Sequence, residues 1–195
     1  VSRLNIATAV THDKFYNTSL FYGIAGLQNY GALNDPSLAP ALTPTVKSAG
    51  GTSWANALAQ EILADVQKAF AQLQLQSGSN LEMTDPLTLG LHSVSETYLA
   101  NTNSYGLVSA IELIKKTFPN IRVQQAPQFL SGTTYSFQLF APTVQGQTTI
   151  EGGYNDKMRA HRMVYDTSSA RQKKTSGTIG ALIYQPFAIV SMSGI

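Results

Sequence analysis

The chain has 195 residues and 43% of them are hydrophobic, which is enough for one packed domain with a small appended one. Only 12% are Asp, Glu, Lys or Arg, about half of the roughly 25% usual in soluble domains. The formal net charge of +2 is too small to argue for nucleic-acid binding, and the absence of cysteine excludes disulfides and thiolate metal sites.

The polar surface must therefore come mainly from uncharged residues, because 61 of the 195 are Ser, Thr, Asn or Gln. Interface cores are depleted in charge, so this balance fits a subunit covered by its neighbours. It fits an uncharged monomer surface equally well, and composition leaves both interpretations open. No apolar run reaches the roughly 18 residues of a membrane span, and the N-terminus lacks the pattern of a signal peptide. Neither export nor a membrane partner is expected.

Residues 1–21 follow an imperfect helical pattern that starts without a capping signal, as if the chain began inside a longer helix. Glycines at 23, 26 and 31 end this pattern. The segment Asn34–Gly51 contains three prolines and has little periodicity, so we predict a loop or an extended linker there.

The longest helical pattern of the chain is predicted for Ser53–Gln76, and Gly78 can end it in the left-handed conformation. Its apolar stripe consists of Trp54, Leu58, Ile62, Val66, Phe70 and Leu73. Trp54 is expected to pack in the core rather than to anchor a partner. The charged residues Glu61, Asp65 and Lys68 are expected away from the stripe.

The next segments alternate between strand and helix signals. A strand at Leu87–Leu91 is preferred over a helix start at Asp85–Pro86. The further predictions are a short helix at 94–99, an amphipathic helix at 107–118, a strand beginning at 121 and a strand at 135–140.

The C-terminal part is more basic than the rest. Residues 151–195 carry six basic and three acidic side chains, whereas residues 1–150 carry seven and eight. Gln145–Gly153 is predicted to be a boundary or hairpin, and Gly152–Asp156 a turn, since it lacks the ligand spacing of a calcium loop. Arg171–Lys174 could contact phosphates, but a short solvated loop between strands is preferred because no aromatic residue is interleaved with it. Strands are expected at 178–183 and 187–190, on either side of a bend at Gln185–Pro186.

No known catalytic or phosphate-binding motif is present in the sequence. His12, His92 and His161 lie about 70 to 80 residues apart, without the i, i+4 spacing of helical metal ligands. Asp13 follows His12, but adjacent helical residues diverge by roughly 100° and do not face one reacting atom. We therefore predict no catalytic, cofactor-binding or metal-ligating residue.

The order of these segments resembles the Hong Kong 97-type capsid fold of the major capsid proteins of tailed bacteriophages and prophages. The similar motifs are the turn after the first helix, the opening of the main helix, the strand and short helix after it, the next helix and strand, and a late strand: Gly23–Asn29, Ser53–Ala55, Leu87–Leu99, Leu107–Pro127 and Gln185–Ile189. His92–Ser93 departs from the family's proline-rich turn, and Tyr184–Gln185 replaces a basic pair that is often found there.

The resemblance implies an α+β fold with an axial domain at 26–145, a mixed sheet with flanking helices. It implies a partial peripheral domain from 1–25 and 151–184, and a final strand at 185–195 that returns to the axial domain. By the same comparison the chain corresponds to the C-terminal portion of such a protein, beginning inside its spine helix. The family's covalent cross-linking is not transferred, because its loop partner is absent. Without the N-terminal arm, the 195-residue chain alone is expected to be monomeric or a small oligomer.

The function implied by the resemblance is structural, without catalysis and without cofactors. Copies would form hexamers and pentamers of an icosahedral shell around double-stranded DNA, bound without sequence specificity. Portal, scaffold and decoration proteins are further expected partners, and the location is the virion after assembly in the host cytoplasm. The basic segment Lys157–Lys174 would contribute to an interface or face DNA. The alternatives are an encapsulin-type compartment shell and, less favoured, a hydrolytic enzyme whose residues meet only in the folded chain.

Overall fold

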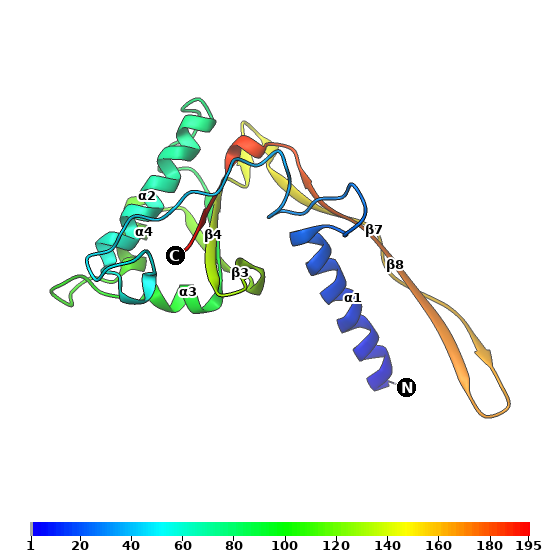
Figure 1. Ribbon diagram of the computed structural model, residues 1–195. Coiled ribbons are helices and arrows are strands. Elements are labelled where there is room, and N and C mark those ends of the chain that lie inside the picture. Colours follow the sequence, from blue (N-terminus) through cyan, green and yellow to red (C-terminus); the bar gives the residue numbers. More distant parts are fainter. Residues whose placement is uncertain (1) are drawn as a thin grey trace. The chain divides into compact units, whose positions relative to one another are not determined.

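The computed structural model describes residues 2–195, and the chain divides into two compact units (Figure 1). The smaller unit comprises Val1–Pro36 and Ile150–Ile183, and the larger one comprises Ser37–Thr149 and Tyr184–Ile195. Residues 26–36 belong to the smaller unit, whereas the division expected from the sequence assigns them to the axial domain.

The larger unit is built on a five-stranded mixed sheet with β4 at its centre. The strands are β1 (Leu87–Leu91), β2 (Ile121–Gln125), β3 (Leu130–Ser131), β4 (Thr134–Phe140) and β9 (Ile189–Ser193). β1 runs parallel to β2 and antiparallel to β4, while β3 and β9 pair antiparallel with β4. Two helices, α3 (Ser93–Tyr98) and α4 (Ala110–Thr117), form the crossover that a parallel β1–β2 pair needs.

The main helix α2 runs over Ala59–Gln76 and therefore begins later than the predicted Ser53. The side-chain hydroxyl of Ser53 caps a separate 3₁₀ turn, η1 (Trp54–Asn56), and the backbone at Ala57 is extended. The apolar pattern continues across this break, which is why periodicity alone joins the two pieces. The end is as predicted, since Gly78 adopts a φ of +64° just beyond the helix.

The core lies between α2, α4 and the sheet. Ile62, Val66 and Leu73 are fully buried on one side of α2, and the ring of Phe70 lies 5.0 Å from that of Phe118. Trp54 is also fully buried, which confirms that it packs in the core. Its ring lies 5.4 Å from that of Phe137 on β4. Burying such large side chains stabilises the unit by roughly 1.5–3 kcal/mol each.

The other predicted elements of this unit are confirmed with small shifts of their ends. The shorter pieces are η2 (Pro127–Phe129), a tight hairpin of β5 (Thr143–Val144) and β6 (Gln147–Thr148), and η3 (Pro186–Ala188). The predicted bend at Gln185–Pro186 is present as the start of η3, where the proline occupies the first turn.

The smaller unit consists of α1 (Ser2–Tyr22) packed on a long antiparallel ribbon of β7 (Ile150–Tyr165) and β8 (Ala170–Ile183) (Figure 1). Two sequence predictions are wrong here, because the expected turn at Gly152–Asp156 and the expected loop at Arg171–Lys174 both lie within strands. The ribbon is mostly polar and exposed along its outer half, so the apolar alternation that normally identifies a strand is missing.

Helix α1 forms hydrogen bonds with this ribbon, and the ring of Tyr16 lies 5.7 Å from that of Tyr154. Tyr16 donates its hydroxyl to the carbonyl of Asp156 at 2.7 Å, and Lys174 donates its Nζ to Asn5 Oδ1 at 2.6 Å. Several large apolar side chains of α1 project to solvent instead: Leu4, Ile6, Val10 and Phe15. This orientation is the reverse of that in an ordinary surface helix, which turns its apolar stripe inward.

Candidate functional site

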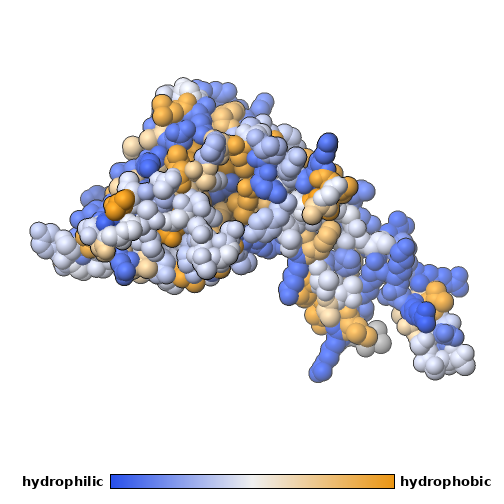
Figure 2. All heavy atoms as spheres, in the orientation of Figure 1, coloured by the Kyte–Doolittle hydropathy of each residue, from blue (hydrophilic) through white to orange (hydrophobic). Residues whose placement is uncertain are grey.

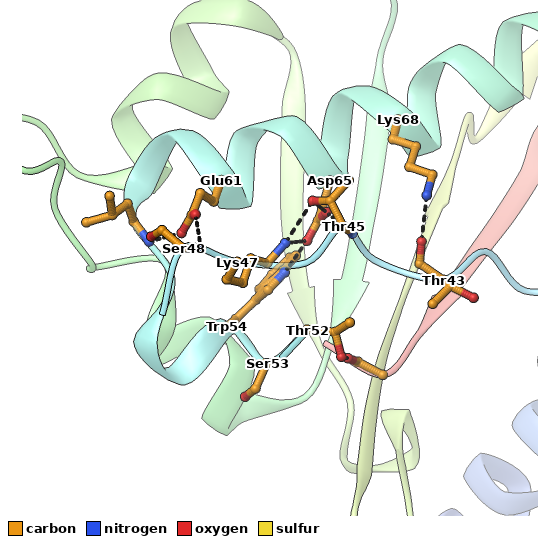
Figure 3. A network of polar contacts seen from close by, with 12 residues as sticks. Thr43, Thr45, Lys47, Ser48, Thr52, Ser53, Trp54, Glu61, Asp65 and Lys68 are labelled. Atoms are coloured by element: carbon orange, nitrogen blue, oxygen red, sulfur yellow. Dashed lines mark hydrogen bonds and ion pairs between the residues drawn. The ribbon is translucent and has the colours of Figure 1, made fainter. Parts of the chain in front are cut away.

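The most heavily hydrogen-bonded side chain of the larger unit is Asp65, at the centre of Figure 3. The sequence pattern predicted it away from the apolar stripe, but it is completely buried. Its Oδ1 accepts hydrogen bonds from the backbone N–H of Thr45 at 3.0 Å and from the Thr45 hydroxyl at 2.7 Å. Its Oδ2 accepts one from Trp54 Nε1 at 2.8 Å and forms an ion pair with Lys47, which is itself 3% exposed.

This network attaches the segment before α2 to the helix. Two peripheral bonds extend it: Lys68 Nζ donates to the carbonyl of Thr43 at 2.7 Å, and Thr52 Oγ1 donates to that of Gly194 at 2.6 Å (Figure 3). Burying a charge is costly unless it is paired and hydrogen-bonded, and here both carboxylate oxygens have donors from the chain itself. The role of the cluster is structural, because both carboxylate oxygens of Asp65 already accept hydrogen bonds within the chain and none is free to bind a substrate.

Each histidine singled out in the sequence bonds to a different group of the chain. His12 Nδ1 lies 2.7 Å from Ser176 Oγ, and His161 Nε2 lies 2.9 Å from Thr175 Oγ1. His92 Nδ1 accepts from the backbone N–H of Val94 and so caps α3. Asp13 is exposed on α1, whereas His12 on the same helix turns to the ribbon.

Residues 2–195 as described contain no group of three or more His, Asp or Glu side chains placed to hold a metal ion. Two carboxylates instead cap helices. Glu61 accepts from the backbone N–H of Leu58 at 2.8 Å and of Ser48 at 2.6 Å, and these bonds lower its pKa below the ordinary value of 4.5. The backbone N–H of Ser109 lowers the pKa of Glu112 in the same way. These carboxylates stabilise the ends of helices.

Exposed large apolar side chains on ordered turns and strand ends say more about function than the polar clusters do (Figure 2). In the larger unit, Tyr105 and Leu107 are 83% and 80% exposed on the turn before α4. Asn103 fixes that turn, since its Oδ1 accepts from the backbone N–H groups of both residues at 3.2 and 3.0 Å. A turn held in one shape presents these side chains at little further entropic cost on binding.

The smaller unit exposes apolar side chains at the far end of its ribbon, chiefly Val164 and Tyr165, and along α1. Figure 2 shows this hydrophobic colouring toward the N-terminal part of α1 and on the ribbon. Exposed patches of this kind mark interaction surfaces.

The basic residues of the ribbon divide between its two faces. Lys174 turns toward α1, where it bonds to Asn5. Since side chains alternate along a strand, Arg171 and Lys173 lie on the opposite face. Arg159 lies on this same face, because it pairs directly with Thr175 of β8 and directly paired residues share a face of the sheet. The side chain of Lys157 lies outside the described part of the structure.

No helix within the described residues combines the length and the apolar character needed to cross a membrane.

A family model described as Pa193 gp26 major capsid protein matches residues 1–194. No curated protein matches the chain. Among solved structures, the capsid of Myoviridae phage XM1 superposes with a TM-score of 0.80 at 12% identity, covering 100% of this chain and 65% of that one. The Mycobacterium phage Che8 structure gives a TM-score of 0.53 at 14% identity, with coverages of 95% and 60%.

The holo-SrpI encapsulin complex from Synechococcus elongatus PCC 7942 is similar at a TM-score of 0.54 and 10% identity, with coverages of 98% and 64%. The chain thus spans less than two thirds of the length of each of these structures. At such low identities the likeness shows the fold alone, and the α+β, Hong Kong 97-type capsid fold predicted from the sequence is confirmed.

Proposed function

Because the chain belongs to the Pa193 gp26 major capsid protein family, we propose that it is the repeating subunit of an icosahedral phage or prophage shell. In this proposal copies assemble into hexamers and pentamers and enclose double-stranded DNA. The observation that carries the proposal is the family match over residues 1–194, combined with exposed apolar side chains on both units. A shell subunit needs several modest contact surfaces, each repeated by symmetry, rather than one concave site.

The two compact units correspond in this proposal to the two domains expected from the resemblance. The larger unit, with its five-stranded sheet and α2, would be the axial domain that faces the capsomer axis. The smaller unit, with α1 and the long ribbon, would be the peripheral domain. The pairing of β9 with β4 supports assigning the C-terminal strand to the axial domain.

Catalysis is not part of the proposed role. The polar cluster around Asp65 is fully used by internal hydrogen bonds, and each of the three histidines bonds to a different group of the chain. The proposed location is the virion, after assembly in the host cytoplasm, and portal, scaffold and decoration proteins are proposed further partners.

We propose that the packaged DNA contacts the face of the ribbon that carries Arg159, Arg171 and Lys173. These three side chains are exposed and lie on one face. Contacts of Arg and Lys with phosphates are independent of base sequence and weaken as salt rises. The opposite face, with Lys174, is left for protein contacts.

An encapsulin-type compartment is the alternative, supported by the similarity to the SrpI encapsulin at a TM-score of 0.54. The phage interpretation is preferred because the family model is that of a phage capsid protein and the XM1 capsid gives the higher TM-score of 0.80.

The test is negative-stain electron microscopy of the protein expressed from its complete gene, beside the 195-residue chain at equal concentration. Closed shells or rings of five and six copies are expected from the gene product, and nucleic acid or cargo inside them separates the phage from the compartment role. Small monodisperse particles in every sample, with any scaffolding partner supplied, would contradict the shell proposal.

A further inference from the structure

The smaller unit contains a groove of about 350 Å³ between the first turns of α1 and the outer part of the ribbon. Leu4 and Asn5 line it from α1, and Met163, Ala170 and Lys174 line it from the strands. The bond from Lys174 Nζ to Asn5 Oδ1, 2.6 Å long, joins the two walls. The groove therefore offers a mainly apolar lining beside one fixed ammonium group.

The end of the ribbon lies next to this groove. Tyr165 is 78% exposed and pairs with Ala170, which is itself part of the lining. Asp166 follows Tyr165 in the connecting turn, where its backbone N–H donates to the carbonyl of Ser169 at 2.7 Å and its Oδ1 accepts from the backbone N–H of Thr167 at 2.8 Å. The tip therefore carries an exposed aromatic residue and a carboxylate at consecutive positions.

The charges of the tip and the groove are complementary. Between residues 157 and 183, Asp166 is the only acidic residue, and six residues are basic. Within one copy Asp166 is at the tip and Lys174 is in the groove, so the acid of one copy suits the base of another. A tyrosine supplies 150–250 Å² of largely apolar surface for burial, and the exposed Leu4 and half-buried Met163 offer a matching lining.

From these features we propose that the ribbon tip of one copy, Tyr165–Asp166, inserts into the groove of a second copy. Tyr165 contacts Leu4 and Met163 there, and Asp166 approaches Lys174. The tip and the groove are adjacent on each copy, so one surface patch contains both the inserted segment and the groove that accepts it. This is the condition for a self-complementary contact about a symmetry axis. The inference rests on the proposed shell function and specifies one of its contacts.

The chain has no cysteine, so single cysteines can report this contact without background. Two variants are made in the gene product, one of them with a mass tag. Thr8→Cys changes another residue that lines the groove, and Thr167→Cys changes the exposed residue after Asp166, so Tyr165 and Leu4 stay in place. The two variants are mixed under assembly conditions and treated with a short bis-maleimide. The expected result is a mixed cross-linked dimer in clear excess over that from the matched control pair, Thr8→Cys with Tyr105→Cys. Tyr105 is 83% exposed, so it is accessible as Thr167 is, but it lies in the other unit.

A third sample adds Asp166→Lys to the Thr167→Cys variant and is expected to lose most of the mixed dimer, because two like charges then face each other. All samples are also viewed by electron microscopy. Shells without a mixed dimer above the control would overturn the tip contact and leave the shell function standing. A mixed dimer without shells would support the contact and count against the shell function, and absence of both would overturn both.

Discussion

The carboxylate of Asp65 on α2 accepts a hydrogen bond from the indole Nε1 of Trp54 at 2.8 Å, eleven residues earlier in the chain. Both side chains are completely buried. This bond joins the 3₁₀ turn before the helix to the middle of the helix, and the ion pair of the same carboxylate with Lys47 brings in the preceding segment. Three separate pieces of the larger unit's core thus depend on one acidic group.

Replacing Asp65 with Ala is expected to lower the free energy of unfolding by about 3–5 kcal/mol, because it leaves the Lys47 ammonium buried and unpaired. Urea titration followed by Trp54 fluorescence measures the change. The double variant Lys47→Met with Asp65→Leu removes both charges and is expected to recover most of the loss. A single Asp65→Ala variant as stable as the parent would contradict the stabilising role assigned to this cluster.

Stability on the acid side is expected to depend on Glu61. Its folded-state pKa is lowered below 4.5 by the N–H groups of Leu58 and Ser48, so the carboxylate contributes stability above pH 4.5. This contribution is lost as the pH falls from 4.5 through the folded-state pKa, where the group takes up a proton. Unfolding in urea at pH values from 7 to 3 should therefore show a smaller acid-side decline in Glu61→Gln than in the parent.

The matched control for this titration is Glu151→Gln, which changes an exposed carboxylate in the other unit. It is expected to keep the parent's pH dependence. Equal slopes for Glu61→Gln and the parent between pH 5 and pH 3 would show that the capping bonds of Glu61 do not contribute to stability.

The elements of the larger unit were predictable because each buries a face with a regular period. Leu87–Leu91 and the stripe of α2 are examples. Asp65 lies on the buried side of α2, three residues after Ile62 and four before Ala69, but a charged side chain predicts a surface position, so its burial was not predicted. Its partners Thr45 and Lys47 lie in a segment without periodicity, so no local signal pairs them with it.

The strand predicted at 178–183 is confirmed as the end of β8, but the rest of the ribbon was not predicted, for a different reason. Its hydrogen bonds with α1 join residues far apart in the chain, such as Tyr16 with Asp156 and Asn5 with Lys174. None of these four residues is strongly apolar, and hydrogen bonds between residues separated by 140 and 169 positions leave no local sequence pattern. The candidate contact surface at Tyr165 was missed with it, although a tyrosine followed by Asp-Thr-Ser-Ser was a visible turn signal.

Gly23→Ala is expected to destabilise the turn that follows α1. Gly23 has a φ of +68°, and a Cβ there would lie 2.0 Å from the carbonyl oxygen of Asn29. Backbone strain in this region costs about 1–3 kcal/mol, and the clash adds to it. Hydrogen exchange of the amides of residues 23–33 measures the loss as faster exchange.

Gly26→Ala is the matched control for this turn. Gly26 also has a positive φ, +87°, but a Cβ there meets no atom within 4 Å. It should show the conformational cost alone. Equal exchange rates in the two alanine variants would mean that the close approach to Asn29 is unimportant for the turn.

Binding of the assembled protein to double-stranded DNA is expected to depend on Arg171 and Lys173. Both are exposed on the face of the ribbon opposite α1. If each contacts one phosphate, the double variant Arg171→Gln with Lys173→Gln reduces the slope of log K against log salt by about 2, without changing the preference for any sequence. Fluorescence anisotropy with two duplexes of unrelated sequence measures both effects.

The control for DNA binding is the double variant Lys115→Gln with Lys116→Gln, which removes the same charge from the last turn of α4 in the other unit. It should keep the parent's salt slope, because those lysines lie at a helix C-terminus, where they offset the helix dipole. A parental slope in the ribbon variant would assign Arg171 and Lys173 to protein contacts instead. A reduced slope in both variants would mean that DNA responds to overall charge rather than to the ribbon face.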